Sequence, residues 1–199
     1  PMAGHISKNY PTSVFNRTQA KADEWVKTFS GNSVSCPEEL GRSCEEIFIC
    51  IGNDNDVRDV IAGDEGILNT MRPGGIIVDH TTTSSILSIE LSNQCLKKDI
   101  NYIDAPVSGG QAGAENGALT IMAGGDKISF EKVAATMECY SKFMKLMGPS
   151  GSGQLTKMVN QICIAGLVQG LAEGINFSEK SGLDTKDVIE VISKGAAQS

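Results

Sequence analysis

The chain has 199 residues, of which 40% are hydrophobic and 21% charged, and its formal net charge is −7. This balance is typical of a globular protein with a core of its own, and the absence of a strongly basic stretch argues against a nucleic-acid partner. The length suits one domain, or one domain and part of a second. Because the chain starts at Pro1 within a helical pattern and stops just after another, we expect it to be cut from a longer coding sequence.

The cysteines and histidines are arranged in a way that does not predict a metal site. Six cysteines are scattered without a CxxC pair, and the two histidines, His5 and His80, are far apart in the sequence. A structural zinc site needs clustered ligands, so none is expected. Several cysteines stand in apolar runs, which indicates reduced thiols and a reducing, cytoplasmic compartment.

The first half of the chain alternates between strand and helix patterns. An opening helix is followed by a short strand over 12–15 and a helix over 18–29, which places Ala22, Trp25, Val26 and Phe29 on one face. Residues 46–52 form a continuous apolar run, which is typical of a strand buried on both faces of a parallel sheet. The segment NDNDV then caps a helix that turns Val57, Val60 and Ile61 inward.

The alternation continues to residue 148. A strand is predicted over 76–79, and the helix opened by TTTSS spaces Leu87, Leu91 and Cys95 four residues apart. Strands over 101–106 and 118–123, a helix over 129–138 and a strand over 142–148 follow. Strands that alternate with helices of this length predict a doubly wound α/β domain.

The pattern changes at the glycine-rich segment GPSGSG, residues 148–153. A long helix is predicted over 152–181, with a stop at Gly182, an N-cap at Asp184 and a short helix that ends near Gly195. We therefore predict an α/β domain over residues 1–150 and the start of an all-helical domain over 151–199. Five polar residues interrupt the apolar run 155–177, so a buried core helix is expected there rather than a membrane helix.

The long helix carries a polar stripe of Gln154, Lys157, Asn160 and Gln161. A buried lysine is unfavourable unless it has a partner or a lowered pKa. Two interpretations remain open: a lysine whose ammonium group reaches water at a domain junction, or a general acid/base that Asn160 orients by a hydrogen bond.

Two strand ends carry further candidate side chains. In DAPVSGG, residues 104–110, Ser108, Gly109 and Gly110 offer a hydroxyl group and backbone N–H groups that can hold a carboxylate; the alternative is a plain tight turn. In DHTT, residues 79–82, His80 is a conceivable proton shuttle, but we favour an incidental neighbour of the helix-capping threonines.

The segment VFNRT, residues 14–18, follows an early strand. In a dinucleotide-binding fold this place faces the adenine ribose, where an acidic residue binds the 2′-hydroxyl and an arginine accommodates a 2′-phosphate. Asn16, Arg17 and Thr18 include no acid, which favours NADP, with NAD still possible. The alternative is an ordinary polar turn in which Thr18 caps a helix.

These segments together resemble the β-hydroxyacid dehydrogenase family, which includes 3-hydroxyisobutyrate dehydrogenases, tartronate semialdehyde reductases and glyoxylate/succinic semialdehyde reductases and is related to 6-phosphogluconate dehydrogenase. The motif DAPVSGG and the glycine-rich segment followed by Lys157-x-x-Asn160 carry the resemblance, which spans essentially the whole chain. It implies a Rossmann-type NAD(P)-binding domain without its first strand and glycine loop, and then the start of an all-α domain for substrate binding and dimerisation.

The resemblance also implies roles for particular residues. Lys157 matches the catalytic lysine and Asn160 the asparagine beside it, while Ser108, Gly109 and Gly110 match the segment that binds the substrate carboxylate. Cofactor contacts are implied for seven residues: Asn16, Arg17, Thr18, Ile51, Gly52, Asp56 and Thr82. The family often has Leu-Pro where this chain has IGND, and a second asparagine where this chain has Gln161. A histidine stands at the position of Asn160 in 6-phosphogluconate dehydrogenases, so decarboxylation of that sugar phosphate is not expected.

The expected activity is an NADP-dependent hydride transfer between a small hydroxy acid and its semialdehyde, with Lys157 as general acid/base. The expected partner is a small aldehyde or hydroxy acid that bears a carboxylate, and the full-length parent is expected to be a homo-oligomer. Two alternatives remain: a non-catalytic dinucleotide-binding or scaffold protein of the same fold, and an inactive gene fragment.

Overall fold

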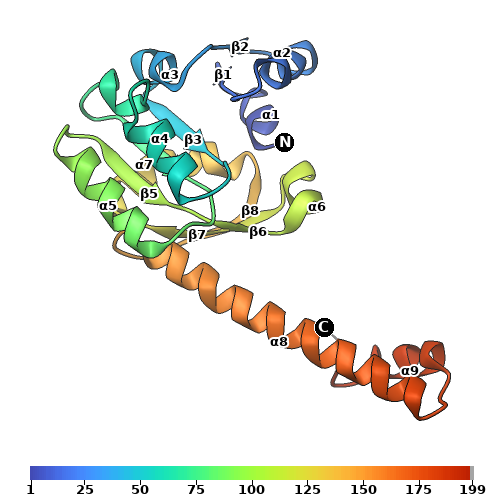
Figure 1. Cartoon of the computed structure of the whole chain (residues 1–199). Coiled ribbons are helices and arrows are strands. Elements are labelled where there is room, and N and C mark those ends of the chain that lie inside the picture. The colour runs from blue at the N-terminus through green and yellow to red at the C-terminus, as the bar shows by residue number, and fades with distance from the viewer. Residues whose placement is uncertain (198–199) are drawn as a thin grey trace. The chain divides into compact units, whose positions relative to one another are not determined.

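The computed structural model describes residues 1–197 and divides the chain into two compact units, Pro1–Lys157 and Met158–Ser199. The first unit is an α/β structure built on a six-stranded sheet (Figure 1). The predicted boundary at 150/151 stays a prediction, and residues 198–199 of the predicted second domain lie outside the described residues.

The sheet of the first unit is parallel on one side and mixed on the other. Strands β3 (Glu46–Ile49), β4 (Ile76–Asp79) and β5 (Asn101–Asp104) are parallel and aligned so that Ile49, Asp79 and Asp104 pair in one row. Strand β7 (Leu119–Gly124) runs antiparallel to β5 and to β6 (Val107–Ser108), whereas β8 (Ser141–Gly148) pairs parallel with β7. The sequence predicted the strands of this α/β sheet but not the antiparallel pairing or the short β6.

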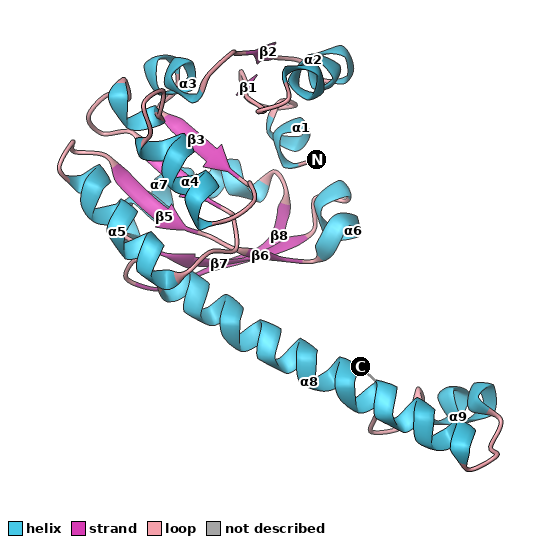
Figure 2. Cartoon of the chain, in the orientation of Figure 1, coloured by secondary structure: helices cyan, strands magenta, loops and turns pink. Residues whose placement is uncertain are grey.

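Helices cover both faces of this sheet (Figure 2). One face packs against α4 (Asp54–Ala62), the 3-10 turn η1 (Ile67–Asn69) and α5 (Ser85–Leu96), and the other against α7 (Lys127–Glu138). The central strand β4 is buried throughout, with Ile77 in one core cluster and Ile76 and Val78 in the other. The predicted inward residues of α5, spaced four apart, are all buried, which confirms the helical spacing: Leu87, Leu91 and Cys95.

The prediction for strand 46–52 is wrong in two respects. Strand β3 ends at Ile49, and only Ile47 and Ile49 are fully buried, while Glu46 and Phe48 are partly exposed. β3 is the edge strand of the six-stranded sheet, so it pairs with a neighbour only on the side of β4. An apolar run alone does not distinguish an edge strand from a central one.

The N-terminal part of the first unit contains a separate two-stranded sheet, in which β1 (Ser13–Val14) pairs parallel with β2 (Asn32–Ser33). Two helices belong to the same part, α1 (Met2–Ile6) and α2 (Gln19–Thr28). The short helices α3 (Pro37–Ser43) and α6 (Gly110–Glu115) complete the unit. The sequence analysis missed β2, α3 and α6, because each is too short to show a hydrophobic period.

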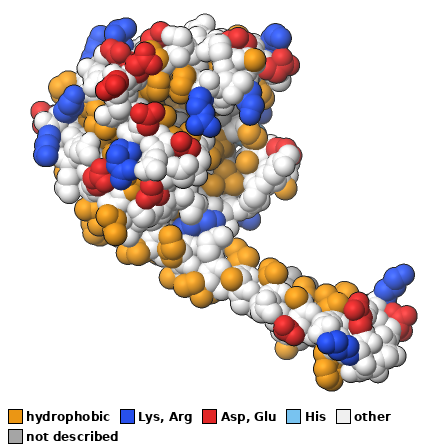
Figure 3. Space-filling model, in the orientation of Figure 1, with side chains coloured by type: hydrophobic (Ala, Val, Ile, Leu, Met, Phe, Trp, Pro, Cys, Tyr) orange, Lys and Arg blue, Asp and Glu red, His pale blue; other side chains and the backbone are white. Residues whose placement is uncertain are grey.

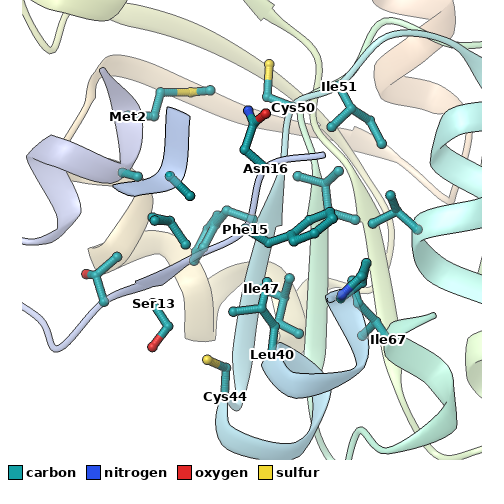
Figure 4. A pocket seen from close by; sticks show the side chains of 18 of the residues that line it. Met2, Ser13, Phe15, Asn16, Leu40, Cys44, Ile47, Cys50, Ile51 and Ile67 are labelled. Atoms are coloured by element: carbon teal, nitrogen blue, oxygen red, sulfur yellow. The ribbon is translucent and has the colours of Figure 1, made fainter. Parts of the chain in front are cut away.

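A cavity of about 1640 Å³ lies between these N-terminal segments and β3. Figure 4 shows Phe15, Leu40 and Ile47 among the apolar side chains that line it, with Asn16 and Ile51 toward one end. This space separates β1 from the edge of the six-stranded sheet.

The second unit contains most of α8 (Ser152–Lys180), whose first turns belong to the first unit, and α9 (Thr185–Ile192). As predicted, Asp184 caps α9 with its side chain, and Gly182 has a positive φ of 71°. The prediction of a buried core helix over 155–177 is wrong for this chain, because large apolar side chains of α8 such as Val159 and Ile162 are exposed. Figure 3 shows hydrophobic side chains along the surface of this helix.

Helix α8 is also long and apolar enough to cross a membrane, and its apolar stretch is not buried. Length and composition do not by themselves separate a membrane helix from a core helix of a soluble protein. The expectation that the chain has no membrane partner therefore stays a prediction.

Candidate active site

The carboxyl ends of β3, β4 and β5 meet at one edge of the sheet, because Ile49, Asp79 and Asp104 are paired in register. The segments that leave this edge are 50–52, 80–84 and 105–108. Ligands bind at this edge in open α/β sheets. Thus three of the predicted site segments leave the sheet at the edge where a ligand is expected.

Lys157 lies against the segment that was predicted to bind the substrate. Its Nζ donates a hydrogen bond of 2.9 Å to the backbone carbonyl of Val107, the residue before Ser108. Burial lowers the pKa of the Lys157 ammonium group from its usual value. The side chain therefore points toward the DAPVSGG segment, and its role as a general acid stays a prediction.

Ser108, Gly109 and Gly110 form the turn between β6 and α6. Gly109 has a φ of 134° and Gly110 a φ of 61°, and both values favour glycine over any residue with a Cβ. Ser108 is partly buried in β6 opposite Thr120. The tight-turn and carboxylate-binding interpretations are therefore compatible, since the same two glycines make the turn and expose its backbone.

Six of the seven predicted cofactor residues line the same cavity: Asn16, Arg17, Thr18, Ile51, Gly52 and Asp56. Arg17 is 88% exposed and its Nη1 lies 3.6 Å from Oδ1 of Asp56, while the side-chain oxygen of Asn16 accepts a 2.9 Å hydrogen bond from Thr18 N–H. A Cβ on Gly52 would collide with the Asp56 carboxylate. The sequence thus predicted a set of residues that the fold brings together.

Thr82, the seventh residue, has an exposed side chain in the loop after β4. This loop is tied to the cavity by its neighbour Thr81, whose Oγ1 accepts a 3.1 Å hydrogen bond from Ile51 N–H. Asn160 belongs to the second unit, where its side-chain amide donates a 3.0 Å hydrogen bond to Gln161. The predicted roles of Thr82 and Asn160 stay predictions.

The structure corrects the predicted polar stripe at its first residue. Gln154 has no exposed surface, and its side chain bonds the loop after β4 rather than facing a cleft. Spacing along a helix identified the stripe, but it could not show which neighbouring loop would cover its first member.

His80 is more than an incidental neighbour of the threonines. It is buried, its Nδ1 lies 2.6 Å from the Ala105 carbonyl oxygen, and its Nε2 lies 2.7 Å from the Tyr140 hydroxyl group. Burial lowers its pKa to about 4, so the imidazole is neutral at pH 7. His80 therefore holds β4, β5 and the end of α7 together. Within residues 1–197 no group of three or more His, Cys, Asp or Glu side chains is placed to bind a metal.

Asp79 is a buried carboxylate between β4 and β5. It accepts hydrogen bonds from Thr81 N–H at 2.8 Å and from the Tyr102 hydroxyl at 2.9 Å. Burial raises its pKa to about 6, against roughly 3.9 in an unfolded chain. The folded state thus binds this proton more tightly than the unfolded chain does. The proton's contribution to the free energy of unfolding is therefore complete below about pH 4 and is lost as the pH rises through about 6.

Asp79→Asn should abolish this pH dependence of the free energy of unfolding, because asparagine resembles the protonated acid at every pH. Relative to the wild type, the variant should gain up to about 3 kcal/mol in free energy of unfolding between pH 4.5 and 7.5. Urea unfolding at a series of pH values measures the difference, with Asp64→Asn at an exposed carboxylate as the control. Parallel stability curves for Asp79→Asn and the wild type would contradict the prediction.

Comparison with known proteins connects these features to a family. Residues 1–149 match the NAD binding domain of 6-phosphogluconate dehydrogenase, and residues 151–199 match the NAD-binding domain of NADP-dependent 3-hydroxyisobutyrate dehydrogenase.

Similar full-length sequences agree with these matches. An uncharacterized oxidoreductase of Shewanella frigidimarina is 52% identical to this chain, and the alignment covers the whole chain and 69% of the relative. The Arabidopsis thaliana protein named “Probable 3-hydroxyisobutyrate dehydrogenase-like 2, mitochondrial” is 41% identical, and the alignment covers the whole chain and 66% of that protein. The chain thus spans about two thirds of the length of these relatives.

A solved structure shares the fold. The 3-hydroxyisobutyrate dehydrogenase of Mycobacterium tuberculosis superposes with a TM-score of 0.90 at 22% identity, over all of this chain and 67% of that one. This likeness confirms the predicted Rossmann-like α/β fold followed by a helical segment. From the matching domains and the similar sequences together, the chain belongs to the β-hydroxyacid dehydrogenase family.

Proposed function

We propose that the protein is an NADP-dependent oxidoreductase that interconverts a small 3-hydroxy acid, or a related hydroxy acid, and its semialdehyde. The observation that carries this proposal is the 2.9 Å hydrogen bond from Lys157 Nζ to the Val107 carbonyl, which places an ammonium group next to Ser108. Family membership supports the reaction class and a nicotinamide dinucleotide.

Lys157 is the proposed general acid. Because burial lowers the pKa of its ammonium group, this group gives up a proton more readily than a fully solvated lysine. It donates that proton to the carbonyl oxygen of the semialdehyde, and in the reverse direction the neutral amine accepts it from the hydroxyl. The nicotinamide supplies or accepts the hydride.

The substrate carboxylate is proposed to bind the turn at Ser108, Gly109 and Gly110. A hydroxyl and backbone N–H groups can together hold an anion, and the turn has no Cβ atoms at Gly109 and Gly110, whose positive φ values favour glycine. Lys157 and this turn would then contact opposite ends of the same short molecule. That arrangement selects small aldehydes and hydroxy acids that carry a carboxylate.

The dinucleotide is proposed to bind the residues that line the cavity, together with Thr82. The local chemistry fits, because the cationic Arg17 lines the cavity and its side chain is exposed. Arg17 would bind the 2′-phosphate of NADP, assisted by Asn16 and Thr18. Its present partner, Asp56, offers little competition, since an exposed ion pair of 3.6 Å is weak.

Arg17→Ala should therefore weaken the binding of NADPH and leave the binding of NADH nearly unchanged. Loss of one charge-assisted contact corresponds to a KM for NADPH about 10- to 100-fold higher, whereas the KM for NADH should change little. Initial rates with both cofactors measure the two effects, and Lys27→Ala serves as the matched control, because Lys27 is an exposed cation of α2 outside the cavity lining. An equal rise in both KM values would remove Arg17 from 2′-phosphate recognition.

The test of the function is cofactor absorbance in the whole protein. NADPH and NADH would each be mixed with glyoxylate, succinic semialdehyde, tartronate semialdehyde and methylmalonate semialdehyde. Oxidation of NADPH by at least one of them is expected. Tight NADPH binding without turnover would favour the non-catalytic alternative. A homo-oligomeric state and a cytoplasmic location are further parts of the proposal.

A further inference from the structure

The side chain of Gln154 is a buried connection between helix α8 and the loop after β4. Its Nε2 donates a 2.8 Å hydrogen bond to the Thr81 carbonyl, and its Oε1 accepts a 3.1 Å hydrogen bond from Thr83 N–H. Gln154 has no exposed surface. Both ends of the amide are therefore used, and the two partners fix which end is oxygen and which is nitrogen.

These two bonds flank Thr82, the loop residue proposed to contact the cofactor. Gln154 binds the backbone on either side of Thr82, while the Thr82 side chain itself is exposed. The side-chain amide donates one hydrogen bond to the loop backbone and accepts one from it, as the backbone of a neighbouring β-strand would. It thereby fixes the backbone that presents Thr82.

The helix end of this connection is fixed by Asp104. The buried Asp104 carboxylate accepts hydrogen bonds from Gly151 N–H at 2.7 Å and from Gln154 N–H at 3.0 Å, so the last residue of β5 holds the first turn of α8. Lys157 stands three residues after Gln154, on the same face of the helix, and bonds the Val107 carbonyl. One helical turn thus touches both the proposed cofactor loop and the proposed substrate segment.

We propose that Gln154 is a positioning residue that holds the Thr82 loop at a fixed distance from Lys157, so that cofactor and general acid are aligned. This inference rests on the proposed function, since it concerns the same site. Gln154 touches neither reactant in this scheme and acts through the backbone of Thr81 and Thr83.

Two substitutions in the whole protein test the donor–acceptor requirement. Gln154→Met keeps the length of the side chain but removes both hydrogen bonds. Gln154→Glu restores them when the acid is protonated, because a carboxylic acid has one donor and one acceptor. Burial and the neighbouring Asp104 carboxyl group both raise the pKa of that acid, so a larger fraction of it is protonated at pH 5.5 than at pH 8.5.

The readouts are NADPH dissociation constants from fluorescence and hydrogen exchange of the peptide that contains the Thr83 amide, each as a ratio to the wild type at the same pH. Gln154→Met should raise the dissociation constant about tenfold or more, the equivalent of one to two lost hydrogen bonds, and accelerate exchange at Thr83 at both pH values. Gln154→Glu should lie closer to the wild type at pH 5.5 than at pH 8.5.

Met137→Ala controls for general loss of stability, because Met137 is buried in α7 within the core cluster on the other face of the sheet. If Met137→Ala raises the dissociation constant for NADPH as much as Gln154→Met at equal stability, or if Gln154→Met leaves both that constant and the exchange at Thr83 unchanged, the positioning role is wrong. If the wild type binds NADPH but reduces no semialdehyde, the proposed function fails while the exchange and binding ratios still decide the role of Gln154.

Discussion

Lys157→Ala is expected to lower kcat by about two to four orders of magnitude, as for loss of a general acid. The Nζ atom of Lys157 lies 2.9 Å from the Val107 carbonyl, and burial lowers the pKa of its ammonium group. Alanine removes the proton donor from the proposed site while leaving the helix intact, because it is the residue most favourable to helices. NADPH oxidation by the preferred semialdehyde gives kcat and KM for the variant.

The matched control is Lys132→Ala, which removes an exposed lysine from helix α7. Turnover by this variant should equal that of the wild type. If Lys157→Ala instead keeps its kcat and only raises KM, Lys157 binds the substrate without transferring a proton. If kcat and KM both keep their wild-type values, the remaining interpretation is a lysine at the domain junction whose ammonium group is solvated and takes no part in the reaction.

Local sequence pattern predicted the fold best where an element carries a complete hydrophobic face. Leu87, Leu91 and Cys95 recur every four residues, and the helix they predict is α5. The strand over 76–79 is apolar at three of its four residues because it is central and packs on both faces. The candidate residues at the strand ends also follow from the pattern, since parallel strands bring their carboxyl ends to one edge.

Sequence could not predict features that depend on distant partners. The apolar run 46–52 resembles a central strand, yet β3 is at the edge of its sheet. The residues of α8 form an apolar helix, yet most of them are exposed in this chain. Gln154 was recognised only as a polar residue on a helix, because its partners Thr81 and Thr83 are more than 70 residues away along the chain.

The glycine-rich segment before α8 has a packing role that composition does not reveal. In GPSGSG, Gly151 and Gly153 are both buried. A Cβ on Gly153 would lie 2.5 Å from the Met122 carbonyl oxygen and 2.6 Å from that of Asp104. Gly153 is therefore required by the close approach of three backbone segments, and flexibility is not needed to explain it.

Gly153→Ala should consequently destabilise the protein by about 3 kcal/mol, at the upper end of the cost of overpacking. The Cβ atom meets backbone carbonyl oxygens of β5 and β7, which cannot move aside without disturbing the sheet. It would also press on the Asp104 carboxylate, 2.8 Å away, which anchors the first turn of α8. Denaturant unfolding of both proteins measures the loss.

The same substitution at Gly166 in the same helix should have the opposite sign. No described atom outside the backbone of α8 lies within 4 Å of a Cβ built on Gly166. Alanine there is expected to stabilise the helix by up to about 1 kcal/mol, since it restricts the unfolded chain and favours helix. If both variants gained stability, the close backbone contact at Gly153 would be wrong. A loss at Gly153 alone would show that packing, rather than helix propensity, selects glycine at the start of α8, next to Gln154 and four residues before Lys157.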